Sequence, residues 1–201
     1  MAEADWKYLF PVLLKVPDDL RRLRGKQKVA ALSAEARRAL ALSAALSGID
    51  LPVRLEKNER GAPLPAGDRH WSLTHKPAWT GAVISPAPVG IDIETVRPFH
   101  PGLPKKVATA GEWALAQAPV ETLLFRFWTA KEAVLKASGT GLGGLDQCRI
   151  VSAAEPACTV IRFQDRDWPV FHRYFDDQVA AVTGPAIPLR WSLLELPRPP
   201  S

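Results

Sequence analysis

The sequence predicts an α+β fold in which each half of the chain offers one long helix and several short strands. Ser33 is a capping residue for a helix that runs to about Ser47, and 120–138 has a helical distribution of apolar residues. Short runs rich in Val, Ile and aromatic residues occur at 79–84 and 88–94, and strand-like runs recur beyond residue 144. A basic connection broken by Pro and Gly at 97–106 is expected to separate the two halves.

Length, composition and charge limit the class of protein. The chain has 201 residues, of which 47% are hydrophobic, enough for one compact unit or two small subdomains. No apolar run approaches the roughly 18 residues of a membrane span, and residues 1–5 lack the features of a secretion signal, so we expect a cytoplasmic protein. The net charge of +5 favours anionic partners, but no motif indicates nucleic-acid binding.

The first half begins with strand-forming residues at 6–14. Pro17 and two acidic residues then predict the start of a short helix. A basic cluster follows, which in most proteins is a solvated helix face, before the helix that Ser33 caps and Gly48 ends. This cluster comprises Arg21, Arg22, Arg24, Lys26 and Lys28.

The second half is expected to begin with a short helix at 112–116, before the long helix at 120–138. Beyond Gly144 the alternation of apolar and polar residues predicts a series of antiparallel strands separated by polar turns. The expected strands are 148–152, 159–163, 169–175, 179–182 and 189–194.

Glu132 is placed unusually on the long helix. At about 100° per residue it falls within an apolar sector, where an ionised carboxylate is costly unless a cation or several donors meet it. An ordinary interpretation is an ion pair with Lys136 one turn later, although the apolar flanks favour a partner elsewhere. Gly139 then supplies a left-handed cap at the end of the helix. The sector is formed by Leu124, Phe125, Trp128 and Leu135.

Two further carboxylates lie on one predicted strand. In 89–94 the alternation places Asp92 and Glu94 on one face and two isoleucines on the other. Two carboxylates on one face repel each other, and oxygen ligands of this kind suit a hard divalent cation such as magnesium. A solvent-facing strand without a metal is the alternative interpretation of this segment taken alone.

The two segments together are more specific than either alone. Gly-Ile-Asp-Ile-Glu at 90–94, followed by Trp-Thr-Ala-Lys-Glu-Ala at 128–133 and then Lys136, resembles the signature pair of the 4'-phosphopantetheinyl transferases. The chain length is similar to that of the single-chain surfactin-synthetase-activating (Sfp) type. This resemblance implies a pseudo-twofold pair of α+β halves, each a long helix on a small antiparallel sheet.

The same resemblance implies how the chain is organised. We expect residues 1–96 to form an N-terminal half that holds coenzyme A-binding elements and the Asp92 strand, and residues 97–201 to form a C-terminal half that holds the Glu132 helix. The active site would lie between the halves, and we expect a monomer.

The implied reaction transfers 4'-phosphopantetheine from coenzyme A to a serine of an apo carrier protein and releases 3',5'-adenosine bisphosphate. Magnesium would be held by Asp92, Glu132 and, as third ligand, Glu94. Glu132 would accept the serine proton directly or through a metal-bound water. Lys136 would stabilise charge on the phosphate or leaving group, whereas Lys131 would hold the nucleotide.

The resemblance also implies a set of coenzyme A-binding residues. Arg38 matches the arginine of the family best, and Lys26 and Lys28 are looser candidates for the phosphates. The segment Asn58-Glu59-Arg60-Gly61-Ala62-Pro63 resembles a turn beside the adenine pocket, so Gly61 and Pro63 are assigned to it.

The adjacent segments depart from the family pattern at several positions. Ala62 replaces the usual lysine of the turn, which puts one phosphate or base contact in doubt. His75 matches a residue that holds the 3'-phosphate, Thr74 replaces a serine and keeps its hydroxyl, and Lys76 adds a positive charge.

The implied partner is an acidic apo carrier protein of fatty-acid, polyketide or peptide synthesis, and the sequence leaves open which of these. Lys105 and Lys106 follow the metal-binding strand and are candidates for contact with it, although solvated loop lysines are the simpler interpretation. The alternative functions are a non-catalytic coenzyme A or nucleotide binder of the same fold and a metal-dependent hydrolase. Intact Asp92, Glu132 and Lys136 argue against the first, and the second lacks an identifiable water-activating group.

Overall fold

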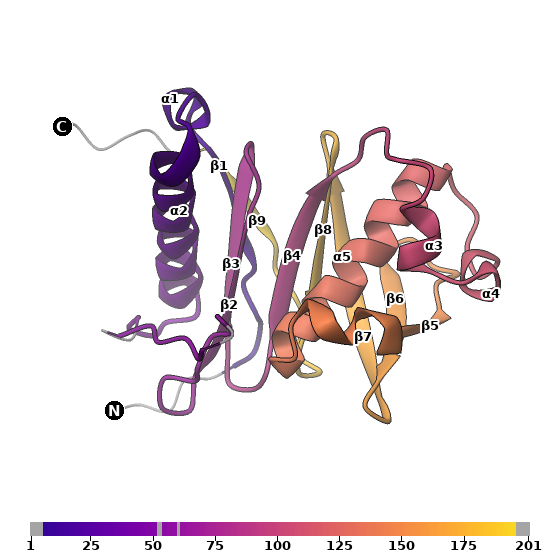
Figure 1. Cartoon of the computed structure of the whole chain (residues 1–201). Helices are drawn as coiled ribbons and strands as arrows, with labels where there is room; N and C mark the ends of the chain where they lie inside the picture. The colour runs from indigo at the N-terminus through magenta and orange to yellow at the C-terminus, as the bar shows by residue number, and fades with distance from the viewer. Residues whose placement is uncertain (1–5, 52–53, 60, 196–201) are drawn as a thin grey trace.

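Two small sheets, each packed against one long helix, account for most of the molecule (Figure 1). The computed structural model describes residues 6–51, 54–59 and 61–195. The predicted α+β class is confirmed. Among the described residues, no helix combines the length and the apolar character needed to cross a membrane.

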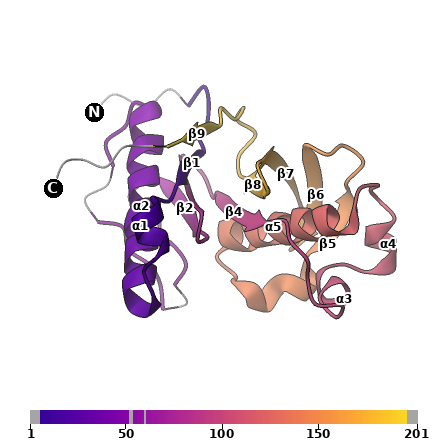
Figure 2. The same cartoon turned by 90° about the horizontal axis from the view of Figure 1, so that it is seen from above.

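The first sheet has the strand order β2-β3-β1-β9. Its strands are β2 (His70–His75), β3 (Trp79–Ser85), β1 (Val12–Lys15) and β9 (Ser192–Leu194). Helix α2 (Gly25–Leu46) covers one face of this sheet, and the view from above shows it on the side away from α5 (Figure 2). The contact uses small residues such as Ala36 and Ala39, which are fully buried and allow the helix to approach the strands closely.

Helix α2 begins nine residues earlier than the capping pattern predicts. It starts at Gly25 after Arg24, so Ser33 lies inside the helix and the expectation that Ser33 caps it is wrong. The physical reason is that the stretch from Lys26 to Leu32 contains good helix formers and no breaker, so propensity extends the helix toward its N-terminus.

The second sheet is antiparallel throughout, with the order β4-β8-β7-β6-β5. Its strands are β4 (Gly90–Thr95), β8 (Gln178–Thr183), β7 (Arg166–Phe175), β6 (Cys158–Phe163) and β5 (Arg149–Ser152). Helix α5 (Val120–Ser138) packs mainly on β4 and β8 and has the predicted bounds. Short helical segments complete the chain, namely α1 (Asp18–Arg21), α3 (Pro104–Val107), α4 (Ala110–Trp113) and the 3-10 helix η1 (Leu142–Gln147).

The two sheets exchange strands across the expected boundary between residues 96 and 97. Strand β4 belongs to the first part of the sequence but pairs with β8, and β9 comes from the end of the sequence but pairs with β1. The 189–194 strand, expected to be antiparallel, is therefore a short parallel strand in the first sheet. The division of the chain into halves at residue 96 stays a prediction. The two sheets do not follow this division, because each contains strands from both sides of residue 96.

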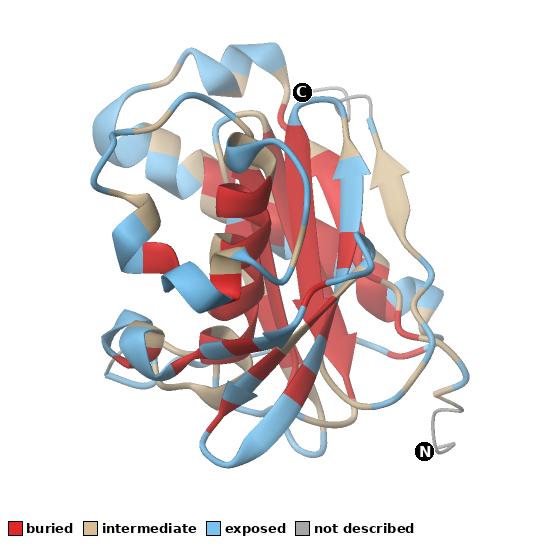
Figure 3. Ribbon diagram, turned by 90° about the vertical axis from the view of Figure 1, so that its right-hand side faces the viewer, coloured by how far each residue is buried: buried red, intermediate tan, exposed pale blue. Residues whose placement is uncertain are grey.

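The core between the sheets is built by the apolar face of β4. Ile91 and Ile93 are fully buried there and pack in one cluster with residues such as Leu13 and Trp79. Each isoleucine contributes roughly 1.5–3 kcal/mol through burial. Figure 3 shows buried residues throughout the central strands and exposed residues on the outer loops. The alternation of β4 therefore fixes its polar face toward α5.

A buried basic cluster connects α5 to strands β6 and β7. The Arg126 guanidinium donates to Thr159 Oγ1 at 3.0 Å and to the carbonyl oxygens of Glu155 and Cys158. His172 Nε2 lies 2.9 Å from Thr159 Oγ1. Burial, together with the positive charge of Arg126, lowers the pKa of His172 to about 3, so this imidazole is neutral in the folded protein at physiological pH.

Candidate active site

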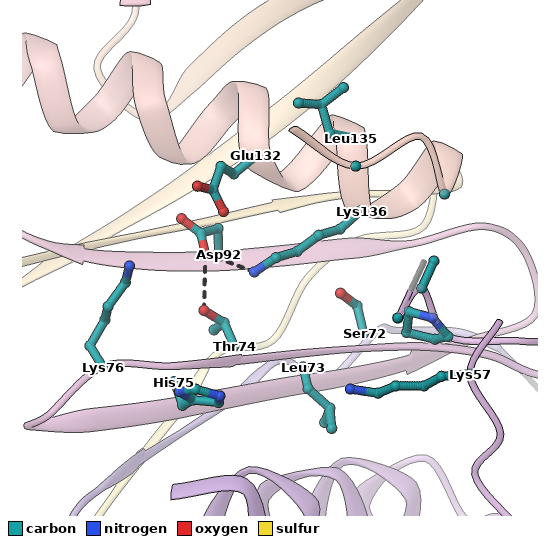
Figure 4. Close-up of a pocket in the computed structure, with 15 residues that line it drawn as sticks. Lys57, Ser72, Leu73, Thr74, His75, Lys76, Asp92, Glu132, Leu135 and Lys136 are labelled. Atoms are coloured by element: carbon teal, nitrogen blue, oxygen red, sulfur yellow. Dashed lines mark hydrogen bonds and ion pairs between the residues drawn. The ribbon is translucent and has the colours of Figure 1, made fainter. Parts of the chain in front are cut away.

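A cavity of about 380 Å³ lies between β2, β4, the end of α5 and the segment around residues 57–63 (Figure 4). It contains side chains of opposite charge. Its lining consists of Lys57, Gly61, Ala62, Pro63, Ser72, Leu73, Thr74, His75, Lys76, Asp92, Glu132, Leu135, Lys136, Gly139 and Gly141.

Strand β4 places two carboxylates on the side that faces α5. Asp92 is 1% exposed and Glu94 is 8% exposed, so neither is a solvent-facing strand residue, and that interpretation is wrong. Strand β2 lies beside β4, where Thr74 Oγ1 donates a hydrogen bond of 3.0 Å to Asp92 Oδ1. Ser72 Oγ accepts from the Ile91 amide at 3.1 Å, so edge strand β2 of one sheet fixes edge strand β4 of the other.

Gly90 explains how closely α5 approaches β4. A Cβ atom at this position would lie 1.8 Å from the carbonyl oxygen of Ala133 and 2.9 Å from the amide nitrogen of Ala137. Any larger residue would therefore displace the helix. The absence of a side chain at residue 90 brings the C-terminal half of α5, with Glu132 and Lys136, next to Asp92.

Asp92, Glu94 and Glu132 form one carboxylate cluster. One oxygen from each residue can be chosen so that all three lie within 4.8 Å of one another. Glu132 projects from α5 toward Asp92, as Figure 4 shows. Helix α5 ends at Gly139, whose φ of 70° is the left-handed conformation expected for the cap.

Two lysines neutralise part of this negative charge. Lys136 Nζ donates to Asp92 Oδ1 at 2.8 Å and to the carbonyl oxygen of Ile91 at 3.0 Å. Lys76 Nζ lies 2.5 Å from Glu94 Oε1. The ordinary interpretation of Glu132, an ion pair with Lys136 on the same helix, is not observed, because Lys136 reaches across to β4 instead.

The pKa values of the two glutamates of the cluster, Glu132 and Glu94, are raised. Burial and the negative charge of Asp92 raise the pKa of Glu132 to about 7, against the opposing effect of Lys136. Burial also raises the pKa of Glu94, although Lys76 opposes this effect. A carboxylate whose pKa lies near 7 is suited to accept a proton in a reaction at neutral pH.

The residues present fit a divalent cation. Three carboxylates supply hard oxygen ligands, and Asp92 Oδ2 is buried without a hydrogen-bond partner among the described residues. A cation beside this oxygen would satisfy it and would also relieve the repulsion between Asp92 and Glu132. The number and type of ligands are those that magnesium accepts when water and phosphate fill its remaining positions.

Comparison with known families identifies the segment that contains this cluster. Residues 88–183, which include β4 and α5, match the model of the 4'-phosphopantetheinyl transferase superfamily. The match covers just under half of the chain, which is similar to that superfamily through this segment. The resemblance of the signature pair at 90–94 and 128–136 is thereby confirmed.

Individual 4'-phosphopantetheinyl transferases are also similar to the chain. The chain is 31% identical over 94 residues to 4'-phosphopantetheinyl transferase gsp of Aneurinibacillus migulanus, covering 45% of this chain and 40% of that protein. It is 29% identical over 104 residues to psf-1 of Bacillus pumilus, covering 50% and 45% of the two chains. The transferase Sfp of Bacillus subtilis strain 168 is 30% identical over 98 residues, which cover 45% and 43%. The chain thus spans less than half the length of these curated relatives.

Lys131, for which the superfamily motif implied a nucleotide role, is not among the residues that line the cavity. Its Nζ lies 3.2 Å from Glu112 Oε1, and its side chain is only 3% exposed. Glu112 also accepts hydrogen bonds from the amides of Thr109 and Ile150. Because Lys131 takes part in this buried ion pair, it does not line the cavity, and its contact with coenzyme A stays a prediction.

The residues expected to bind coenzyme A divide into two groups. Gly61, Pro63, Thr74 and His75 all line the cavity, as do the catalytic candidates. Arg60 of the expected turn lies outside the described residues.

The basic residues of α2 do not line this cavity. Lys26 and Lys28 are in the first turn of α2, and Lys28 Nζ donates to the carbonyl oxygen of Arg21. Arg38 lies in the middle of the helix, 3.8 Å from Glu35 Oε2, and not in the early turns that a helix capped by Ser33 would give it. The cause is the earlier start of α2, which shifts every position that was counted from Ser33.

Sequence reasoning missed two side chains at this site. It noted the charge of Lys76 but did not predict its ion pair with Glu94, which depends on how β2 and β4 pack. It did not single out Lys57 at all. Its position just before the Asn58 turn could have indicated this, because a residue at that position pairs with Pro63 across the turn.

Proposed function

We propose that the protein transfers the 4'-phosphopantetheine group of coenzyme A to a serine hydroxyl of an apo carrier protein, releasing 3',5'-adenosine bisphosphate. The observation that supports this function most strongly is the cluster of Asp92, Glu94 and Glu132 beside a cavity with basic groups. The similarity of residues 88–183 to the superfamily supports the same reaction class. Coenzyme A is the substrate, and the enzyme is magnesium-dependent.

The three carboxylates would hold magnesium, which when bound supplies positive charge that neutralises the pyrophosphate oxygens of coenzyme A. Asp92 is the central ligand, because its free Oδ2 is buried and directed into the cluster. Glu94 is the third ligand and would exchange part of its contact with Lys76 for the cation. Burial of the β4 carboxylates keeps competing water away from the reacting groups.

Glu132 acts as the general base. It projects into the cavity from α5, where its carboxylate can accept the proton of the carrier serine directly or through a metal-bound water. Once deprotonated, the serine oxygen attacks the phosphorus atom that carries the pantetheine group. The bond between this phosphorus and the bridging oxygen breaks, and adenosine bisphosphate leaves with that oxygen.

Lys136 orients Asp92 and stabilises the leaving group. Its Nζ already donates to Asp92 Oδ1 and to the Ile91 carbonyl, which leaves one of its three protons for a phosphate oxygen. This donor is held by two contacts and so is preorganised before substrate binds. All of these groups belong to one chain, and the active unit is a monomer.

The carrier protein is proposed to be acidic and to approach from the side of α3. Lys105 and Lys106 are exposed at the end of this helix, which packs against α5 near its N-terminal half. The net charge of +5 favours encounter with an acidic partner. This contact would bring the carrier serine to Glu132 from the side opposite the 57–63 segment.

The decisive experiment incubates the protein with an apo carrier protein, coenzyme A and magnesium, and measures the mass of the carrier. The expected result is a gain of one phosphopantetheine group, which is lost when magnesium is removed by a chelator. The matched control is Glu132→Gln, which removes the base and a charged ligand while keeping the size of the side chain. Binding of coenzyme A without any mass gain, over a panel of carriers, would instead indicate the non-catalytic binder.

A further inference from the structure

Lys76 connects the end of β2 to the carboxylate cluster. It follows directly after β2, and its amide donates to the Trp79 carbonyl at 2.7 Å, which fixes its backbone at the turn into β3. From there its Nζ reaches Glu94 Oε1 at 2.5 Å, and the two side chains are only 28% and 11% exposed. Figure 4 shows the Lys76 side chain directed from β2 toward β4. A lysine of one sheet is therefore paired with a carboxylate of the other.

The contacts of Lys76 differ from those of Lys136, the other lysine at the cluster. Lys136 Nζ is held by both Asp92 Oδ1 and the Ile91 carbonyl, and it leaves Asp92 Oδ2 unpaired. In the described part of the chain, Glu94 is the only hydrogen-bond partner of the Lys76 ammonium group. A flexible lysine side chain held by one contact can leave it without breaking another. Lys76 can therefore release its carboxylate more readily than Lys136 can.

Glu94 also belongs to the carboxylate cluster. One of its oxygens can be chosen within 4.8 Å of oxygens from Asp92 and Glu132. A divalent cation at the cluster would be attracted by Glu94 and repelled by the ammonium group of Lys76. Because like charges repel strongly in a partly buried site, the two positive groups oppose each other at this carboxylate. The cation must displace Lys76 from Glu94 or bind more weakly.

We propose that Lys76 is an internal competitor of magnesium, whose ammonium group holds Glu94 and lowers the affinity of the cluster for the cation. This inference rests on the proposed function, in which Asp92, Glu94 and Glu132 hold magnesium. An uncharged residue at position 76 would leave Glu94 to the cation at every magnesium concentration. Lysine makes this third ligand conditional, because binding of the cation has to break the contact between β2 and β4.

The test measures the dissociation constant of magnesium by calorimetry for the parent protein and for Lys76→Met, which keeps a long side chain and removes the charge. Breaking a charge-assisted contact weakens binding by about ten-fold or more, so the variant should bind magnesium tighter by that factor. Lys57→Met is the matched control. It removes the charge of another cavity lysine, which among the described residues forms no ion pair with Glu94, and it should change the affinity less.

A second pair of variants tests whether Lys76 acts through Glu94. In the Glu94→Gln background the carboxylate is absent, so adding Lys76→Met should give a much smaller gain in magnesium affinity than it gives in the parent. An equal gain in both backgrounds, or no gain in the parent background, would overturn the proposal.

Urea unfolding separates this role from a purely structural ion pair. Without magnesium, Lys76→Met leaves Glu94 unpaired beside two carboxylates, so its unfolding midpoint should fall below that of the parent. Saturating magnesium should remove most of this difference, because the cation then takes the place of the ammonium group. The same loss with and without magnesium would contradict the proposal.

The outcomes also distinguish this proposal from the proposed function. If Lys76→Met binds magnesium no more tightly while the parent transfers phosphopantetheine, the proposed function stands and only the role of Lys76 fails. If neither protein binds magnesium and the parent transfers no phosphopantetheine, both are refuted.

Discussion

Replacing Gly90 by alanine tests whether the close approach of α5 to β4 creates the active site. The added Cβ would lie 1.8 Å from the Ala133 carbonyl oxygen, and real Cβ atoms keep at least 3.0 Å from such neighbours. The contact is with helix backbone, which cannot rotate away, so α5 must move relative to β4 by about 1 Å. A displacement of this size at a catalytic group lowers the rate by about 100-fold.

The same variant should lose stability. Overpacking of a buried contact costs about 1–3 kcal/mol, measured as a lower midpoint in urea unfolding. Gly111→Ala is the control, because its Cβ meets no atom within 4 Å and it lies in helix α4, where alanine is favoured by about 0.5–1 kcal/mol. If Gly90→Ala keeps the stability and transfer rate of the parent, the close contact does not organise the site.

Three further predictions concern the carboxylate cluster, His172 and the exposed lysines of α3. Asp92→Ala or Glu132→Ala should lower transfer at saturating magnesium by at least about 100-fold in a carrier-mass assay, and near-parental rates in either would refute the ligand assignment. His172 has a folded pKa of about 3, below its usual 6.5, so stability should be intact above pH 6.5 and fall as pH drops from there toward 3. Urea unfolding should show that His172→Gln loses about 2 kcal/mol less than the parent between pH 7 and 5, and identical losses would contradict the shift. Lys105→Glu/Lys106→Glu should raise the KM for an acidic carrier in initial-rate assays and leave the Kd of coenzyme A unchanged. A weaker Kd for coenzyme A with an unchanged KM for the carrier would show that the carrier does not bind at α3.

The parts of the site that were predictable from sequence are those fixed by local periodicity. The alternation in β4 predicts that Asp92 and Glu94 share a face, and the helical period places Glu132 on the buried side of α5. Glycine at residue 139 predicts the end of that helix. In each case one element decides the direction of its own side chains, so no knowledge of the neighbouring elements is needed.

The parts that sequence did not predict depend on contacts between distant segments. Lys131 and Lys136 are both lysines on α5, yet Lys131 pairs with Glu112 and Lys136 pairs with Asp92. Nothing in the local pattern shows where Glu112 will lie. The start of α2 was missed because Ser33 is a plausible cap by itself, whereas the helix formers before it decide the outcome.

The exchange of strands between the two sheets affects how the molecule can come apart. A break of the chain between residues 96 and 97 would leave β4 on a fragment that lacks its partner β8, and β9 on a fragment that lacks its partner β1. Each fragment would then expose the unpaired backbone groups of a strand edge, which favours aggregation or reassociation. The pairing of β4 with β8 and the pairing of β9 with β1 therefore each join the first part of the sequence to the second. We expect the halves to fold and unfold together as one cooperative unit.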